Sequence, residues 1–386
     1  MPTSDFKPLL FSLFCVRILH INSARTFGGG ERHTADLVNA LEARGHELYA
    51  ALSGRSPVIE ELKSLPAERI FELRLRNALD VPSANELARR VLERRIEIVH
   101  AHVARDYPLA ALAARRGGAQ LILTRHLEYP LSRFHRWTLS RSVARVIAVS
   151  EAVADSLLKQ KIFPPEKIRY IPNGIEVERF KPDASHALER ESFRRSLAGD
   201  APFLIGITGE LREHKGQEDF VRAAQLVVQS FRDAHFIIGG EDASRGREYR
   251  AHLERLVREL DLEGRVHFTG WLATVTPLLH ALDVFVSSSR VEPFGLVMVE
   301  AMAAGLAVVA TRTGGACEIV EDGVTGKLVP VGDVEAMAEA IKALLTDERE
   351  RRRMGEAGES RARSLFSLDR MVSETEALYR EALGAK

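Results

Sequence analysis

The sequence predicts an α/β protein made of two Rossmann-like units, each built on a parallel sheet. Short β-branched and apolar runs alternate with longer helical patterns from Val16 to Pro330, as expected for βαβ units. The pattern pauses in a polar stretch with two prolines, residues 178–202, and then starts again. A length of 386 residues also favours two domains over one. We therefore expect two parallel sheets that face each other across a cleft.

The expected strands can be placed from their apolar runs. In the first half, VRILHIN (16–22) indicates a buried strand, which a glycine-rich turn and a helix ending before Gly45 follow. Further strands are expected at 96–102, 121–126 and 146–150, and in the second half at 203–209, 235–240, 266–270, 283–289 and 306–311. In open α/β sheets ligands bind at the carboxyl ends of strands, so polar residues there are site candidates.

Composition excludes several classes of protein. Lys and Arg number 54, as do Asp and Glu, so no overall field favours nucleic acid. The two cysteines, Cys15 and Cys317, are far apart, which argues against structural zinc and a disulfide framework and fits a reducing cytoplasm. The apolar run 8–16 is too short to span a bilayer and lacks a small-residue cleavage site. We expect residues 1–14 to be an extension before the first strand, and any membrane contact to be peripheral.

The segment EPFGLVMVEAMAAG (292–305) carries the clearest chemical signal. Pro293 stands where a helix would begin, so the amides of Phe294, Gly295 and Leu296 would form an anion site. Glu300 would follow Gly295 by about 7.5 Å along the helix, at ~1.5 Å per residue, which suits a nucleotide's β-phosphate and ribose. Glu292, before the helix, would meet a sugar. Alternatively, this is an ordinary strand–turn–helix whose glutamates are solvated or cap the helix.

This segment resembles the E-x7-E motif of family 4 of the retaining glycosyltransferases, which have the two-domain GT-B fold. Further stretches resemble the same family in order: GGGE (28–31), IPNGIEVERF (171–180), GELREHKG (209–216), VHFTGWL (266–272) and TRTGGACEIVEDGVTGKLVPVGD (311–333). The resemblance covers nearly the whole chain from Val16. It implies an acceptor-binding domain over 1–180 and a nucleotide-sugar-binding domain over 181–366. It also implies that a helix over 367–386 packs back onto the first domain.

The resemblance also implies roles for particular residues. Lys215 and the amides around Gly295 would hold the diphosphate, Glu300 the ribose and Glu292 the transferred sugar. His126 would lie near the reacting sugar, with His102 as a second candidate; His100 is expected to face the opposite side of its strand. The expected catalytic residues are His126, Glu292 and Lys215, and the expected donor contacts are Gly29, Gly209, Arg212, Lys215, Leu272, Glu292, Phe294, Gly295, Leu296 and Glu300.

One position departs from the family pattern. The second domain of the family commonly opens with Gly-Arg-Leu, whereas this chain has Glu210 in place of the arginine. Because a carboxylate would repel the diphosphate, we expect Glu210 to point away and Arg212 to supply the missing charge.

Other interpretations of these residues stay open. Lys215 also fits a surface lysine, and His126 also fits a histidine that satisfies local backbone. GGGERH is not G-x-G-x-x-G, since His33 takes the third glycine's place, which counts against a dinucleotide dehydrogenase. Asp-x-Asp is absent from the sequence, so metal-bridged binding of a diphosphate has no obvious ligands. We expect no metal and no cofactor, with the nucleotide sugar as substrate.

A basic stretch with aromatic residues suggests a peripheral membrane contact. At 100° per residue, Arg133, Arg136, Arg141 and Arg145 share about half a helical turn with Phe134 and Trp137. Such a face suits an anionic membrane, which Arg133, Arg136, Trp137 and Arg141 would contact. A solvated helix with its aromatics in the core is an equal alternative.

The resulting hypothesis is a cytoplasmic, metal-independent, retaining glycosyltransferase. It would move a sugar from a UDP-sugar or GDP-mannose to a glycan or lipid-linked acceptor in cell-envelope polysaccharide or lipopolysaccharide synthesis. No convincing carboxylate nucleophile is found, so the resemblance implies front-face transfer in which the departing phosphate accepts the acceptor's proton. A GT-B-like sugar-nucleotide epimerase and a non-catalytic sugar-nucleotide-binding protein are the alternatives.

Overall fold

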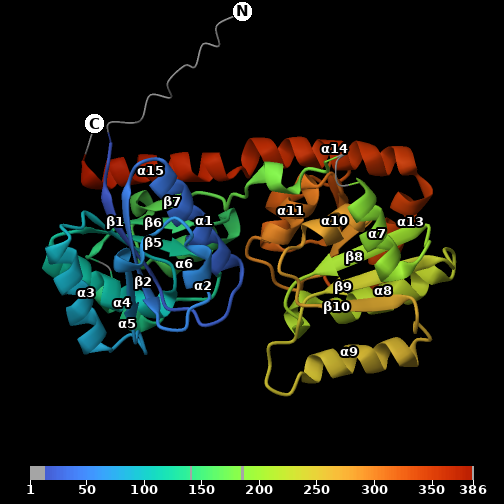
Figure 1. Ribbon diagram of the computed structural model, residues 1–386, viewed down its shortest axis with the longest axis horizontal. Helices are drawn as coiled ribbons and strands as arrows, with labels where there is room; N and C mark the ends of the chain where they lie inside the picture. The colour runs from blue at the N-terminus through green and yellow to red at the C-terminus, as the bar shows by residue number, and fades with distance from the viewer. Residues whose placement is uncertain (1–13, 140, 184–186, 385–386) are drawn as a thin grey trace, which may run out of the picture. The chain divides into compact units, whose positions relative to one another are not determined.

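The computed structural model describes residues 14–139, 141–183 and 187–384, which divide into two compact units (Figure 1). The first unit holds the described residues up to Val149, Val153–Ile171 and those from Met371 onward. The second holds Ser150–Ala152 and Pro172–Arg370. Most of the expected extension, residues 1–13, lies outside the described residues.

The first unit is built on a seven-stranded, fully parallel sheet of order β3-β2-β1-β4-β5-β6-β7. Its strands are β1 (Arg17–Asn22), β2 (Glu47–Ser53), β3 (Ile70–Leu73), β4 (Ile98–Ala101), β5 (Gln120–Arg125), β6 (Val143–Ala148) and β7 (Ile168–Tyr170). Its helices are α1 (Gly29–Ala43), α2 (Val58–Glu61), α3 (Val81–Glu93), α4 (Tyr107–Gly117), α5 (Arg133–Leu139) and α6 (Glu151–Gln160). All four strands expected in this half are present. Their apolar runs suit strands that are buried on both faces of a parallel sheet.

The second unit has a six-stranded parallel sheet of order β10-β9-β8-β11-β12-β13. Its strands are β8 (Phe203–Thr208), β9 (Ala234–Gly239), β10 (Val266–Gly270), β11 (Val284–Ser287), β12 (Ala307–Thr311) and β13 (Gly326–Val329). Its helices are α7 (Ala187–Ala198), α8 (Gln217–Val228), α9 (Glu248–Glu259), α10 (Thr276–Ala281), α11 (Leu296–Ala303), α12 (Gly314–Ile319), α13 (Val334–Thr346) and α14 (Glu348–Leu365). The core includes Phe220, Phe236, Ile238 and Val286. The expected α/β class with two parallel sheets is confirmed.

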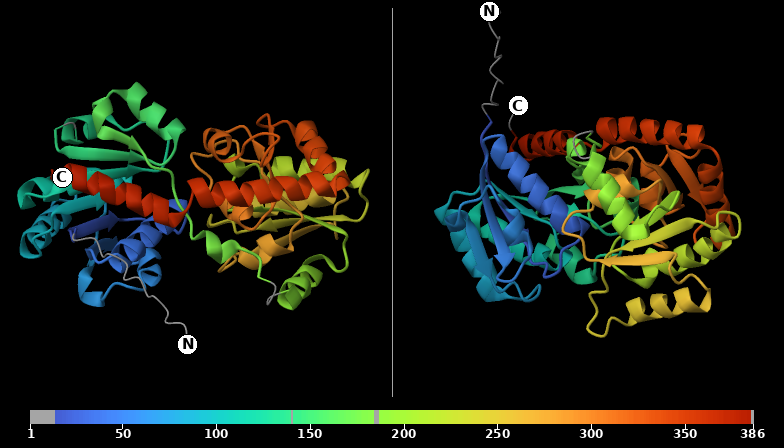
Figure 2. Two further views of the ribbon diagram at one scale, coloured as in Figure 1. Left: turned by 90° about the horizontal axis from the view of Figure 1, so that it is seen from above. Right: turned by 45° about the vertical axis from the view of Figure 1, so that its right-hand side comes forward.

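The chain ends in two successive helices, α14 and α15 (Leu368–Leu383), drawn in red in Figure 2. From Met371 onward α15 belongs to the first unit. Its Tyr379 is fully buried there, with the hydroxyl 2.7 Å from His100 Nδ1. Its Glu376 accepts from Arg44 at 2.8 Å and lies 2.9 Å from His46 Nε2. The end of the chain therefore contributes to the polar core of the first unit.

The expected boundary at residue 180 needs correction. Residues 172–180 belong to the second unit, because Val177 and Phe180 are buried there. Ile175 also donates its amide to Phe366 at 2.9 Å and accepts from the amide of Leu368 at 2.8 Å. These contacts make the segment part of the second unit's structure rather than the end of the first.

The expected basic helical face over 133–145 is also wrong beyond Leu139. Helix α5 ends at Leu139, which is fully buried, and the chain then turns into β6. Arg141 lies in that turn, and Arg145 lies on β6, with its Nε 3.5 Å from Glu381 of α15. Only Arg133, Arg136 and Trp137 remain together on the helix, and Trp137 is 80% exposed. In the described parts of the chain, no helix has the length and apolar character to cross a membrane.

Candidate functional site

The turn before α11 is set by Gly295. This residue has φ +106°, and a Cβ on it would lie 2.3 Å from Met298 Cε. A residue in the left-handed region cannot continue a right-handed helix, so α11 begins at Leu296 and not at Pro293 as the sequence predicted. The eight-residue helix therefore presents the amides of Leu296 and Val297 as its first unpaired donors. The expected anion site therefore keeps the amide of Leu296 and gains that of Val297.

Phe294 and Gly315 hold this turn in place. The Phe294 side chain is buried, and its ring meets Phe366 edge-on at 5.8 Å, so only its backbone remains for a ligand. Gly315 donates its amide to Glu292 O at 2.9 Å. A Cβ on Gly315 would lie 2.1 Å from Phe294 O, so no other residue fits there. The sequence pointed to this Gly-Gly pair only by resemblance; its packing under the Glu292–Gly295 turn gives it a physical role.

Glu292 and Lys215 are brought together from positions 77 residues apart in the chain. Lys215 Nζ donates to Glu292 Oε2 at 2.6 Å, and Ser289 Oγ donates to the same oxygen at 3.2 Å. The Glu292 side chain is 9% exposed and that of Lys215 is 28% exposed. The two expected catalytic residues of the second unit thus form a mostly buried ion pair. Ser289, which the sequence analysis did not single out, fixes the carboxylate.

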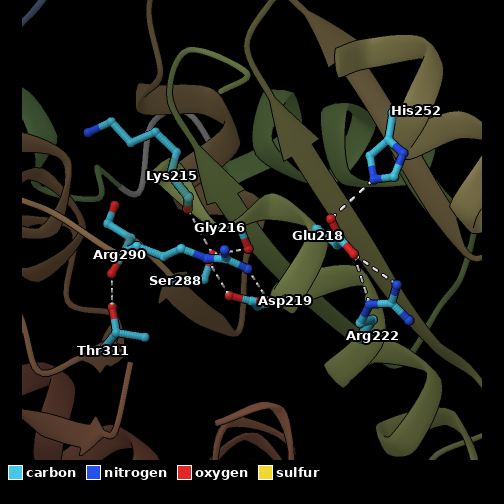
Figure 3. A network of polar contacts seen from close by, with 10 residues as sticks. Lys215, Gly216, Glu218, Asp219, Arg222, His252, Ser288, Arg290 and Thr311 are labelled. Atoms are coloured by element: carbon cyan, nitrogen blue, oxygen red, sulfur yellow. Dashed lines mark hydrogen bonds and ion pairs between the residues drawn. The ribbon is translucent and has the colours of Figure 1, made fainter. Parts of the chain in front are cut away.

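The Lys215–Gly216 step is fixed by its closeness to the end of β11 (Figure 3). Lys215 ends a 3-10 turn, η6 (Glu213–Lys215), and Gly216 has φ +68°. A Cβ on Gly216 would lie 2.0 Å from Ser288 O, and Ser288 Oγ donates to Gly216 O at 2.7 Å. Lys215 is therefore followed by glycine because the two loops leave no room for a side chain. The packing of the two loops therefore fixes the backbone position of Lys215. A surface lysine with no role at the site would not need such a fixed position.

Glu210 and Arg212 pair with each other. Arg212 Nη2 lies 2.6 Å from Glu210 Oε1, and their side chains are 53% and 40% exposed. Each neutralises the other, so Arg212 brings no net positive charge to this loop as long as the pair is intact. His214, in the same loop, has its pKa lowered, first by partial burial and then by Lys215 and Arg212.

The loop after β8 also borders a cavity of about 680 Å³ within the second unit. Its charged lining is largely paired: Glu218 accepts from His252 at 3.1 Å, and Arg290 binds Asp219 at 3.1 Å (Figure 3). Of the expected donor contacts, only Arg212 lines this cavity. It is therefore distinct from the Lys215–Glu292 pair.

The remaining donor candidates of the second unit follow strands or, for Glu300, lie within α11. Gly209 follows β8, with φ +149°, and a Cβ on neighbouring Gly240 would lie 1.9 Å from Gly209 O. Leu272 follows β10 and is half-buried, as is Glu300 on α11. The carboxyl ends of parallel strands share one edge, so these residues, Lys215 and Glu292 lie around the same edge of the second sheet.

Gly29 and His126 belong to the first unit, where the glycine turn lies against His126. Gly29 is the first residue of α1, and a Cβ on Gly30 would lie 3.5 Å from His126 Cδ2. His126 follows β5, and His102 follows β4. Their rings are 6.3 Å apart, and the His33 ring is 4.8 Å from that of His126. Burial lowers the pKa of His126 and His102 well below the usual value, so both are neutral at pH 7.

The expectation that His100 faces away from His102 is wrong. Residues two apart in a strand point to the same face, and the two rings lie 4.3 Å apart. His20 of β1 also joins them, with Nδ1 3.0 Å from His102 Nε2, and burial lowers its pKa to about 3. The alternation of His and apolar residues along β4 was the signal for this cluster.

Family models match two parts of the chain. Residues 27–179 match the family described as Glycosyltransferase Family 4, and residues 189–361 match Glycosyl transferases group 1. The chain is 32% identical over 349 residues to a GDP-mannose-dependent alpha-(1-6)-phosphatidylinositol monomannoside mannosyltransferase of Mycolicibacterium smegmatis, covering 86% of this chain and 89% of that one. It is 28% identical over 361 residues to the lipopolysaccharide core biosynthesis glycosyltransferase LpsE of Rhizobium meliloti, covering 91% and 95%.

A solved structure shows the same fold. Anabaena Alr3699/HepE in complex with UDP-glucose matches with a TM-score of 0.82 at 23% identity, over 94% of this chain and 99% of that one. At this identity the likeness concerns the fold alone.

Proposed function

Because the chain belongs to the family 4, group 1 glycosyltransferases and has their GT-B fold, we propose that it is a retaining, metal-independent hexosyltransferase that uses a nucleoside diphosphate sugar. The observation that carries the proposal is the buried Lys215–Glu292 ion pair beside the N-terminus of α11. It places one cation, one carboxylate and unpaired amides at the edge of a parallel sheet. A diphosphate joined to a sugar needs these same groups.

The donor would be held along α11. The amides of Leu296 and Val297, with the positive end of the helix dipole, suit the diphosphate, and Glu300 would accept from the ribose hydroxyls. Among the described residues, both side-chain hydrogen bonds to the Glu292 carboxylate go to Oε2, and we infer that Oε1 accepts from a hydroxyl of the transferred sugar. Leu272 and Trp271, after β10, would flank the base. Gly29 would let backbone approach the phosphate.

The chemical step needs charge stabilisation more than a nucleophile. Negative charge builds on the β-phosphate as the glycosidic bond breaks, and each preorganised donor there is worth roughly 2.7–4 kcal/mol. Lys215 and the α11 amides are those donors. In front-face transfer the departing phosphate takes the proton from the acceptor hydroxyl, and the configuration at the anomeric carbon is retained. Neither step calls on a metal ion.

The donor class is tested by nucleotide binding without metal. We expect UDP or GDP, but not ADP, to raise the thermal stability of the wild type by about 2.7 kcal/mol at a hundredfold excess over Kd. The variant Glu300→Ala should lose this effect, because the ribose hydroxyls lose their acceptor. Calorimetry in EDTA measures both. Stabilisation by none of the three nucleotides, or an undiminished effect in Glu300→Ala, would contradict the donor site.

The reaction class is tested by products. A UDP-sugar or GDP-mannose incubated with the enzyme and a cell-envelope glycan or lipid-linked acceptor should give a glycosylated acceptor with retained configuration. The relatives that act on a phosphatidylinositol mannoside and in lipopolysaccharide core biosynthesis support this acceptor class. Conversion of the donor sugar without an acceptor would instead identify a sugar-nucleotide epimerase. Binding without any turnover would identify a binding protein.

His126 is proposed to orient or polarise the transferred sugar as a neutral imidazole. The variant His126→Ala should lower kcat by roughly 10²–10³-fold, the usual effect of removing one preorganised polarising group. Nucleotide stabilisation should survive, because the donor-binding residues proposed on α11 and at Lys215 are unchanged. His135→Ala, also in the first unit, is the control and should keep wild-type turnover. A near-normal kcat for His126→Ala would remove His126 from the reaction.

A lipid-linked acceptor would bring the enzyme to a membrane surface. We propose that Trp137 and the exposed Arg133 and Arg136 of α5 make this contact, with Arg141 from the following turn. Each arginine near an anionic surface contributes about 1 kcal/mol. Cosedimentation with vesicles rich in phosphatidylserine should fall for Trp137→Ala and for Arg133→Ala, and vesicles of phosphatidylcholine alone should bind little. Equal binding to both vesicle types would contradict an electrostatic contact.

A further inference from the structure

Five histidines of the first unit, on or directly after three neighbouring strands and on α1, each lie within ring-contact distance of at least two others. We call His20, His33, His100, His102 and His126 the histidine cluster. Two triplets within it place ligand nitrogens within 4.8 Å of one another: His20, His100, His102 and His33, His102, His126. Imidazole nitrogens are common ligands of divalent transition metals, so each triplet is a candidate site.

The first triplet includes His100, whose two ring nitrogens are both already committed to hydrogen bonds. His100 Nδ1 lies 2.7 Å from the Tyr379 hydroxyl, and His100 Nε2 lies 2.7 Å from Thr124 Oγ1. His20 Nδ1 lies 3.0 Å from His102 Nε2. A cation between these rings would have to break one of the two buried hydrogen bonds of His100, which is costly to leave unmade.

In the second triplet, His102 and His126 each keep a ring nitrogen for a ligand. Among the described residues, neither His102 Nδ1 nor His126 Nε2 has a hydrogen-bond partner, although both atoms are shielded from solvent. His102 is 3% exposed and so is His33. Buried polar atoms are normally satisfied, and two orphaned nitrogens in one triplet point to a ligand between them.

His20 supplies the outer partner that such a site needs. A metal-bound histidine usually donates its second ring N–H to an acceptor, which fixes its tautomer and orientation. With a cation on His102 Nδ1, His102 Nε2–H would donate to His20 Nδ1 along the 3.0 Å contact already present. The existing hydrogen bond therefore favours the arrangement instead of competing with it.

We propose that His33, His102 and His126 bind a divalent transition-metal cation that prefers imidazole, for which Zn²⁺ is the probe. Three imidazoles at about 2.0–2.1 Å leave the fourth tetrahedral position open for water or an anion. The nitrogens lie within 4.8 Å of one another, so the rings must close in slightly on binding. The cation would occupy His126 Nε2. Zn²⁺ would then be an inhibitor of sugar transfer and not a cofactor. This consequence rests on the role proposed for His126 in that reaction.

Equilibrium dialysis of the EDTA-stripped, full-length protein against micromolar Zn²⁺ tests the site without any activity measurement. We expect about one Zn²⁺ per wild-type chain and at least tenfold weaker binding in His33→Gln and in His126→Gln. Circular dichroism should show that both variants remain folded. The matched control is His235→Gln, from the His235–His267 pair of the second unit, which should bind as the wild type does.

No Zn²⁺ bound to the wild type, or equal binding by the wild type and both cluster variants, would overturn the site. So would loss of binding in His235→Gln alone. A parallel assay of sugar transfer separates this proposal from the proposed function. Stoichiometric Zn²⁺ binding with undiminished transfer would keep the metal site and remove His126 from the reaction.

Discussion

Replacing Lys215 with alanine is expected to lower kcat by roughly 10²–10³-fold, the usual effect of removing one charge-stabilising donor from a preorganised site. The charge on Lys215 is held 2.6 Å from Glu292 in a place that is only 28% exposed. Its loss removes the cation that would meet the β-phosphate and also leaves the Glu292 carboxylate buried beside Ser289. Steady-state kinetics on wild type and variant at saturating donor measure the effect.

The control for this change is Lys159→Ala, on the exposed side of α6, which should leave kcat unchanged. A double-mutant cycle with Glu292→Gln separates the two roles of Lys215. If the lysine acts on the phosphate as well as on Glu292, Lys215→Ala should still lower kcat in the Glu292→Gln background, with a coupling within about 0.5–3 kcal/mol. A Lys215→Ala enzyme with wild-type kcat would show that the pair is purely structural.

The sequence was most informative where local pattern and final environment agree. The runs 203–209, 235–240 and 283–289 each contain a continuous apolar stretch, and they became β8, β9 and β11, whose apolar residues are mostly buried. By contrast, β2 (ELYAALS) is rich in Glu, Leu and Ala, which favour helix. Pairing with β1 overrode that preference, so the strand could not be placed from its residues.

The candidate site was predictable in its residues but not in its contacts. The motif around Glu292 and Glu300 marks a helix N-terminus, yet the left-handed Gly295 moves the start of α11 to Leu296. The pairing of Arg212 with Glu210 depends on side-chain conformations that composition does not set. The meeting of Lys215 and Glu292 depends on two loops packing at backbone distance, which no local pattern encodes.

Replacing Gly216 with alanine tests that packing directly, and we expect it to lower both stability and donor affinity. A Cβ at this position would lie 2.0 Å from the backbone oxygen of Ser288, so one of the two loops must move. The left-handed φ of +68° adds strain of its own. Together we expect a loss of at least ~2 kcal/mol, since an unfavourable φ costs ~1–3 kcal/mol and overpacking typically ~1–3 kcal/mol.

Gly264→Ala is the matched control, because it separates strain from collision. Gly264 lies in the same unit with φ +76°, and a Cβ on it would meet nothing within 4 Å. The Gly264→Ala variant should therefore lose only the free energy of unfolding that an unfavourable φ costs, and it should keep its stabilisation by nucleotide. In the same calorimetric measurement, Gly216→Ala should lose more of its free energy of unfolding than Gly264→Ala does. It should also lose the stabilisation by nucleotide, because the movement of the loop carries Lys215 away from Glu292. If the two variants lose the same stability and both still bind nucleotide, the contact between Gly216 and Ser288 does not position Lys215. The position of Lys215 would then be set by its ion pair with Glu292 alone.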